Sequence, residues 1–158
     1  MRDTKKALIW ITDILKKENI PFEIDGGMAA NIYGVKRKLA DIDINVPLEH
    51  FNKITLHVKE YITYGPLKYK DDHWDDLMMT LKYSEQDIDI CALGDMKYYD
   101  SINNQWVDMP SDLSNVVFKE YEGVLVPVID KETLINYKKA LNREVDQIDV
   151  DYMIKNNI

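Results

Sequence analysis

Residues 24–46 read IDGGMAANIYGVKRKLADIDINV, and this stretch decides the fold. Its Gly26-Gly27 pair lies between an expected strand and an expected helix, where a backbone without Cβ lets a ligand approach and a helix N-terminus offers N–H groups to an anion. Further along, Asp41 and Asp43 alternate with isoleucines, so period-two geometry places both carboxylates on one face of a strand. Such neighbouring like charges are tolerated where water or a divalent cation compensates them. The stretch therefore predicts a phosphate site beside an acidic, metal-binding strand.

A second acidic strand is expected at residues 86–93, QDIDICAL. It follows an expected strand at 77–83, and the polar pair Ser84-Glu85 would form the turn between them. Alternation places Asp87 and Asp89 on one face. If this strand lies beside the one that carries Asp41 and Asp43, three or four carboxylates converge at one place.

The remaining pattern predicts one α/β (α+β) domain over residues 1–158, with a mixed sheet and helices packed on one side. No internal repeat, low-complexity tract or linker suggests a second domain. Gly123 follows Glu122 in a tight-turn signal that predicts a hairpin. The other expected elements are helices ending near Asn19 and covering 28–33, 47–60, 131–141 and 144–154, and strands at 22–25, 116–121 and 124–129.

Composition narrows the class of protein. The chain has 158 residues, of which 46% are hydrophobic and 30% charged, and this balance is typical of a soluble globular domain. Its first residues carry charges on both sides of a short apolar stretch and lack a small-residue cleavage site, so we expect a cytoplasmic protein without a signal peptide or membrane anchor. A formal net charge of −8 disfavours sequence-independent binding to nucleic acid.

Zinc chemistry and thiol chemistry are both disfavoured. The single cysteine, Cys91, cannot form an intramolecular disulfide, and its place in an apolar strand favours a buried thiol over a nucleophile. The three histidines, His50, His57 and His73, show no metal-ligand spacing and suit surface or packing roles. A zinc site and a Ser-His-Asp triad are therefore not expected.

Two charged runs each allow two interpretations. The basic run 36–38 is either a solvated loop or a contact to a nucleotide or acceptor. The acidic run 71–76, DDHWDD, is either a solvated loop or a segment that binds a cationic acceptor. Trp74 and Trp106 would offer stacking surfaces in the second case, although aromatic residues more often pack in the core.

The order Gly-Gly, spacer, Asp-x-Asp resembles the signature of nucleotidyltransferases with a DNA polymerase beta-like fold. IDGGMAANIYG and ADIDI are most similar to the small lincosamide and aminoglycoside nucleotidyltransferases. QDIDICAL is similar to the strand that carries the family's third carboxylate, and VPVIDKETLINYKKALNREVDQID to its C-terminal helical segment. These segments follow the family's order over most of the chain. The sequence departs from the lincosamide enzymes at Cys91, where a histidine is typical.

The resemblance implies transfer of a nucleoside monophosphate from ATP or another nucleoside triphosphate to an acceptor hydroxyl, with Mg²⁺ or Mn²⁺ as cofactor and release of pyrophosphate. Asp41 and Asp43 would bind metal. Asp89 would bind the second metal and remove the acceptor proton, with Asp87 as the alternative. Gly26-Gly27 would contact the triphosphate.

The same resemblance implies that the C-terminal segment contacts the nucleotide through Lys138 or Lys139, through Arg143 and through Asp146. Lys139 and Arg143 lie four positions apart and would share one helical face if a helix runs through both. The alternative is a pair of surface helices with ordinary charged faces.

Three functions remain open from the sequence. The first is transfer to a small, cationic, hydroxyl-bearing acceptor, with antibiotics among the candidates. The second is a toxin-type nucleotidyltransferase that acts on tRNA or a protein. The third is a non-catalytic relative that binds a nucleotide.

Overall fold

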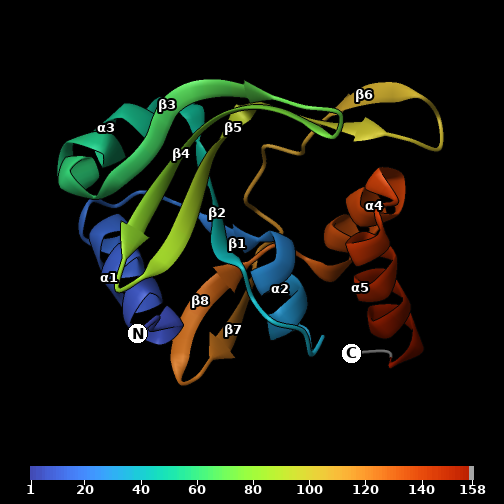
Figure 1. Ribbon diagram of the computed structural model, residues 1–158, viewed down its shortest axis with the longest axis horizontal. Helices are drawn as coiled ribbons and strands as arrows, with labels where there is room; N and C mark the ends of the chain where they lie inside the picture. Colours follow the sequence, from blue (N-terminus) through green and yellow to red (C-terminus); the bar gives the residue numbers. More distant parts are fainter. Residues whose placement is uncertain (157–158) are drawn as a thin grey trace.

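The computed structural model describes residues 1–156, and its centre is a mixed sheet of eight strands (Figure 1). The strand order is β3-β4-β5-β2-β1-β8-β7, and β6 pairs with β5. Among residues 1–156 no helix is long and apolar enough to cross a membrane. The elements are α1 (Thr4–Lys17), β1 (Glu23–Asp25), α2 (Gly26–Ile32), β2 (Asp41–Pro47), α3 (Leu48–Val58), η1 (Lys59–Tyr61), β3 (Ile62–Lys70), β4 (Trp74–Tyr83), β5 (Gln86–Asp100), β6 (Gln105–Asp108), β7 (Val117–Tyr121), β8 (Val124–Val128), α4 (Lys131–Leu141) and α5 (Glu144–Lys155).

The two acidic strands are neighbours at the middle of this sheet. β2 and β5 are parallel, with Asp41 opposite Asp87 and Asp43 opposite Asp89. β1 is antiparallel to β2 and parallel to β8. The predicted mixed sheet is confirmed, and so is the adjacency that brings the carboxylates together.

The isoleucines that alternate with the aspartates form the core on the opposite face. Ile42, Ile44, Ile88 and Ile90 are all fully buried, and burial of each side chain contributes roughly 1.5–3 kcal/mol. Helices α1 and α3 contact the central strands and bury their apolar residues in the same core. Helices α4 and α5 instead stand at the end of the sheet near α2 (Figure 1), where they border the carboxylate side. The expected packing of helices on one side therefore holds for α1 and α3.

The sequence analysis predicted too few strands. It did not predict β3, residues 62–70, which pairs with β4 at the edge of the sheet. β4 begins at Trp74, because Trp74 pairs with Tyr98 and Asp76 with Met96, so the second half of the acidic run is strand and not solvated loop. β5 continues to Asp100 and pairs there with β6, a strand that the sequence did not predict.

The C-terminal helices are two, as predicted, but the break between them separates two residues expected to lie together. Asn142 adopts a left-handed conformation with φ of 55° and ends α4, and Arg143 is the extended N-cap of α5. No single helix runs through Lys139 and Arg143, so the condition under which they would share one helical face is not met.

Candidate active site

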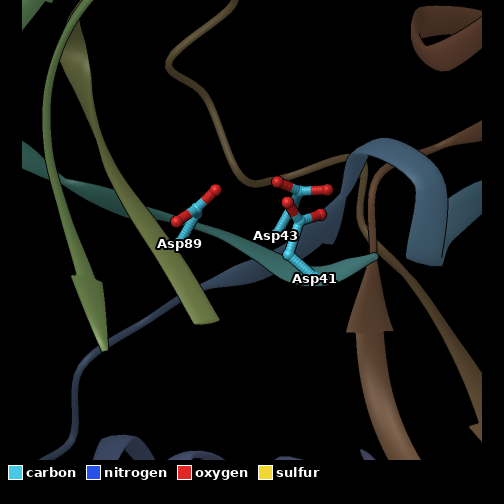
Figure 2. Close-up of side chains that lie close together, drawn as sticks. All are labelled: Asp41, Asp43 and Asp89. Carbon is cyan, nitrogen blue, oxygen red and sulfur yellow. The ribbon is translucent and has the colours of Figure 1, made fainter. Parts of the chain in front are cut away.

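Asp41, Asp43 and Asp89 form a cluster of carboxylates on the open face of the sheet (Figure 2). Each offers an oxygen, and these oxygens lie within 4.8 Å of one another. The parallel register of β2 and β5 brings them together. Asp87 is outside the cluster, since its carboxylate lies 3.1 Å from Lys82 Nζ. The structure thus groups Asp89, not Asp87, with the first two aspartates.

Burial and the proximity of the carboxylates to one another disfavour full ionisation of the cluster. Desolvation, together with the charges of Asp41, Asp89 and Asp25, raises the pKa of Asp43 well above its usual value. Desolvation also raises the pKa of Asp89 to about 6, although Thr80 Oγ1 donates a 2.7 Å hydrogen bond to its carboxylate. A bound cation would relieve this repulsion, and hard carboxylate oxygens are the ligands that Mg²⁺ and Mn²⁺ prefer. The residues present therefore fit a divalent metal.

The Gly-Gly turn approaches this cluster directly. Gly26 has a φ of +59°, and a Cβ at this position would overlap the carboxylate of Asp43. A Cβ at Gly27 would lie 2.8 Å from Arg37 Nη2. From the sequence we expect the N–H groups of this turn to be available to an anion. The Gly26 N–H instead donates to Asp25 Oδ1 at 2.7 Å. These contacts leave close backbone approach as the reason for glycine at both positions.

A buried polar network that the sequence analysis missed supports the turn. Tyr137 Oη of α4 donates to Asp25 Oδ1 at 2.6 Å. Asn45 Nδ2 donates to Asp25 Oδ2 at 2.7 Å and to Glu23 Oε1 at 3.0 Å. Desolvation and the charge of Asp25 raise the pKa of Glu23 to about 8. Asn45 continues the alternation that begins at Asp41, and this was the one signal in the sequence for its position.

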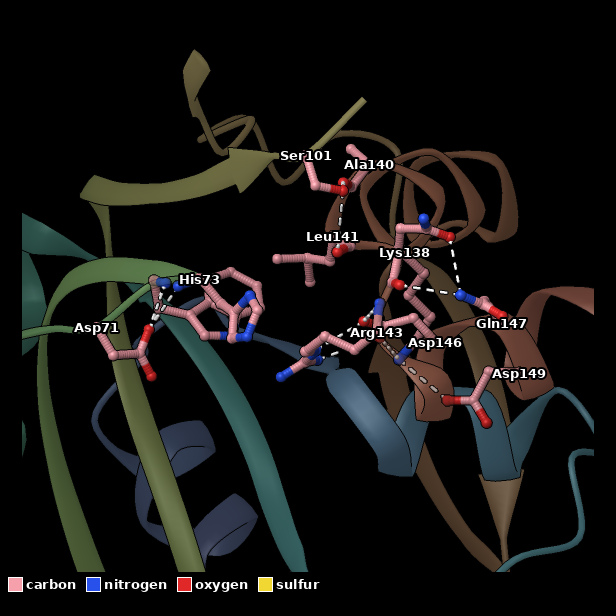
Figure 3. A network of polar contacts seen from close by, with 12 residues as sticks. Asp71, His73, Ser101, Lys138, Ala140, Leu141, Arg143, Asp146, Gln147 and Asp149 are labelled. Carbon is pink, nitrogen blue, oxygen red and sulfur yellow. Dashed lines mark hydrogen bonds and ion pairs between the residues drawn. The ribbon is translucent and has the colours of Figure 1, made fainter. Parts of the chain in front are cut away.

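A second network fixes the basic loop to the C-terminal helices, and Figure 3 shows the part of it within these helices, from Lys138 and Arg143 to Asp146 and Asp149. Lys138 Nζ is buried 3.0 Å from Asp149 and 3.3 Å from Asp146. Arg37 donates to both oxygens of Asp149 at 2.8 and 2.9 Å, and Arg143 Nε donates to Asp146 at 2.6 Å. Burial opposes ionisation of Asp149, but Arg37 and Lys138 outweigh it and lower its pKa. Arg37 is therefore part of an ion-pair network, and the loop is not simply solvated.

The carboxylates lie in a cavity of about 610 Å³ that has two chemically different walls. One wall carries the Gly-Gly turn, Arg37, Lys138 and Arg143. The other wall comes from β3 and β4 and the turn between them, and includes Tyr64, Tyr69, Asp71, Trp74 and Asp76.

No protein-family model matches the chain, and no curated protein sequence matches it. Solved structures do match. A Thermotoga maritima protein assigned to the nucleotidyltransferases has a TM-score of 0.73 at 21% identity, over 100% of this chain and 97% of that one. The lincosamide antibiotic adenylyltransferase LnuA, bound to lincomycin, has a TM-score of 0.63 at 19% identity, over 98% of both chains. ANT(2'')-Ia, in complex with adenylyl-2''-tobramycin, has a TM-score of 0.62 at 16% identity, over 99% of this chain and 91% of that one.

This chain has the nucleotidyltransferase fold. The predicted fold is confirmed by neighbours that extend over nearly the whole chain. Within this nucleotidyltransferase fold, Arg143 lines the cavity, whereas Lys139 is exposed and does not. Trp74 also lines the cavity, while Trp106 packs against Tyr99 outside it.

Cys91, the residue at which the sequence departs from the lincosamide enzymes, also lines the cavity of this nucleotidyltransferase fold. Desolvation raises the pKa of its thiol well above the usual value, and the charges of Asp76, Asp43 and Asp89 add to the shift. The thiol is therefore protonated at neutral pH and is a poor nucleophile.

Proposed function

We propose that this protein is a metal-dependent nucleotidyltransferase that moves a nucleoside monophosphate from ATP or another nucleoside triphosphate to a hydroxyl of a small-molecule acceptor. The observation that carries this proposal is the cluster of Asp41, Asp43 and Asp89, with carboxylate oxygens within 4.8 Å of one another inside a cavity. The shared fold with LnuA and ANT(2'')-Ia supports the reaction class.

The metal would be held by Asp41, Asp43 and Asp89, which offer oxygens only. When bound, Mg²⁺ or Mn²⁺ supplies electrostatic stabilisation of the negative charge that develops during phosphoryl transfer. Asp89 would also accept the proton of the acceptor hydroxyl. Thr80 Oγ1 donates to its carboxylate at 2.7 Å and fixes its orientation.

The nucleotide would occupy the wall that carries Gly26, Gly27 and Arg143. Gly26 and Gly27 allow the triphosphate to approach the backbone, and Arg143 contributes positive charge at the cavity. Lys138 is held between two aspartates, so its role is to position the helices. Lys139 has no part in this site.

A small acceptor suits the size and charge of the molecule better than a polynucleotide. A cavity of about 610 Å³ is within the usual range for small-ligand sites. The formal net charge of −8 repels a phosphate backbone. Antibiotics are among the candidate acceptors, as the names of LnuA and its bound lincomycin suggest.

The first test is Asp43→Asn. We expect loss of transfer of label from ATP in the presence of Mg²⁺, because one metal ligand is removed. The melting temperature without metal should stay the same or rise, because repulsion with Asp41 and Asp89 is relieved. Asp87→Asn is the matched control and should keep activity, since Asp87 lies outside the cluster. Full transfer by Asp43→Asn, or a large loss of stability without metal, would contradict the proposal.

The acceptor class is tested with labelled ATP, Mg²⁺ and two sets of acceptors. One set contains hydroxylated small molecules, including lincomycin and tobramycin, and the other contains tRNA. We expect label in the small molecules. Label in tRNA at physiological ionic strength, and in no small molecule, would replace this proposal with the toxin-type alternative.

A further inference from the structure

The carboxylate of Asp76, on β4, is the feature of the cavity that nucleotidyl transfer leaves unexplained. Asp76 is only 3% exposed and lines the cavity. The Cys91 thiol lies beside this carboxylate and lowers its pKa, which opposes part of the effect of burial. The Oδ1 atom of Asp76 has no hydrogen-bond partner anywhere in residues 1–156. A buried carboxylate oxygen without a partner is costly, so its presence in a cavity points to a ligand that supplies the missing donor.

The cationic side chains that line the cavity, and Lys68 beside it, are paired with other carboxylates. The charge of Lys68 lowers the pKa of Asp76. However, Lys68 Nζ is paired with Asp75 at 3.1 Å and with Asp95 at 3.0 Å. The three cationic side chains of the opposite wall, Arg37, Lys138 and Arg143, are paired with Asp146 or Asp149. Within residues 1–156, Asp76 forms no ion pair, and these four cations are each bound to another carboxylate.

The nearby Asp71 differs from Asp76 in this respect. Its Oδ1 accepts the backbone N–H groups of His73 and Trp74 at 2.8 and 2.7 Å, as the dashed lines from Asp71 in Figure 3 show. Its Oδ2 accepts the hydroxyl of Tyr69 at 2.8 Å. Asp71 thus completes the β3–β4 turn, and Asp76 is the carboxylate of this wall that still requires a donor.

The surroundings of Asp76 suit an ammonium group. The same wall contains Tyr64, Tyr69 and Trp74, whose rings attract cations through their faces, and Met78 adds apolar surface. Desolvation raises the pKa of Asp76 to about 6. A cation bound there would stabilise the charged form, and the interaction gains strength because water is excluded.

We propose that Asp76 and the aromatic wall formed by Tyr64, Tyr69 and Trp74 bind a protonated amine of the acceptor. This inference rests on the proposed function and names the substrate class: a hydroxylated amine. Asp76 lies four positions before Thr80 on β4, the residue that donates to Asp89, and both carboxylates line the same cavity. The amine and the reacting hydroxyl of the acceptor would therefore both bind in this cavity.

Calorimetry with Asp76→Asn tests the proposal. The probes are glucosamine, lincomycin and tobramycin, each beside a comparator whose amines are masked or absent. For the wild type we expect at least one amine to bind more tightly than its comparator. In Asp76→Asn we expect this affinity to fall about tenfold or more, since a hydrogen bond between charged groups is lost. Near pH 6, wild-type binding should also release protons as Asp76 ionises, and this release should vanish in the variant.

Asp75→Asn is the matched control, because Asp75 neighbours Asp76 but is paired with Lys68 and Lys70. It should keep amine affinity. If Asp76→Asn does not fold, Asp76→Leu has the same expected loss of amine binding. The proposal is overturned if no amine binds, if the comparators bind equally well, or if Asp76→Asn keeps the affinity. Binding of ATP with Mg²⁺, measured separately, shows whether the proposed function has failed as well.

Discussion

Gly26 shows how one missing side chain shapes the site. Its backbone passes so close to Asp43 that no Cβ can be accommodated, and its φ of +59° is one that residues with a side chain rarely adopt. Gly123, in the β7–β8 turn, also has a positive φ of +84°, but a Cβ there would meet nothing within 4 Å. A comparison of alanine substitutions at the two glycines therefore separates the effect of backbone strain at positive φ from the effect of steric overlap with Asp43.

We expect Gly26→Ala to lower the free energy of unfolding more than Gly123→Ala does. Strain at positive φ costs roughly 1–2 kcal/mol in both variants, and displacement of Asp43 adds roughly 1–3 kcal/mol to the first. Gly26→Ala should also lose most nucleotidyl transfer, because Asp43 is moved. Urea denaturation and a transfer assay measure the two effects, and equal destabilisation of both variants would show that strain alone decides.

At the scale of elements, the break between α4 and α5 decides which cation reaches the cavity. Arg143 lines the cavity from the N-cap of α5, whereas Lys139 is exposed on the last turn of α4. We expect Arg143→Gln to weaken binding of ATP with Mg²⁺ by about tenfold, as for loss of one charge-assisted contact. Lys139→Gln should leave the affinity unchanged. Titration calorimetry compares them, and equal affinities would assign α5 a structural role only.

The ion pairs between α5 and the basic loop should matter for stability. Asp149 has a fully buried side chain and faces both Arg37 and Lys138. Asp149→Ala would remove one of the two carboxylates that pair with Lys138. We therefore expect it to lower the free energy of unfolding by about 3 kcal/mol. Asp151→Ala, an exposed change on the same helix, should cost little. The lowered pKa of Asp149 implies that its contribution is lost as pH falls below its ordinary titration range. Chemical denaturation at pH 7 measures both variants.

The elements that the sequence predicted well are those whose pattern is local. The Asp-Ile alternation predicted which residues of β2 and β5 lie on each face of the sheet. The Glu122-Gly123 signal predicted the β7–β8 turn. The sequence analysis missed β3, β6 and the start of β4, because pairing between neighbouring strands overrides the polarity of residues such as Asp75 and Asp76.

The site was predictable where residues are close in the sequence and not where they are distant. Asp41 and Asp43 were predictable as site residues from their spacing in the sequence. The hydrogen bond from Tyr137 to Asp25 joins residues 112 positions apart, so only the fold reveals it. Lys138 and Lys139 could not be told apart, because the phase of a helix relative to its neighbours depends on tertiary packing.

At the scale of the whole molecule, buried carboxylates set how stability depends on pH. The pKa of Glu23 is raised to about 8, and those of Asp76 and Asp89 to about 6. The folded state therefore keeps protons that the unfolded state releases. The contribution of these three groups to stability is greatest below the ordinary carboxylate pKa values and is lost as pH rises through about 6 and then about 8, a dependence opposite in sign to that of Asp149.

Glu23→Gln should remove the upper part of this dependence. At pH 8 we expect the variant to be more stable than the wild type by on the order of 1 kcal/mol or more, because no charge is buried. Below pH 4.5, where Glu23 is protonated in both states, the difference should disappear. Glu120→Gln, at an exposed position on β7, is the control. A constant difference at all pH values would show that the effect is one of packing.

The position of β3 at the edge of the sheet bears on how the acceptor specificity of this protein could be altered. The wall near α4 and α5 is tied to the rest of the chain by ion pairs and by the Tyr137 hydrogen bond. The opposite wall is a single hairpin, residues 62–83, attached to the sheet through β5. Under the proposed function, exchange of this hairpin would alter acceptor choice while the nucleotide half stays intact. Under that function, donor and acceptor specificity would be separable, and new acceptors would be accessible through changes confined to about twenty consecutive residues.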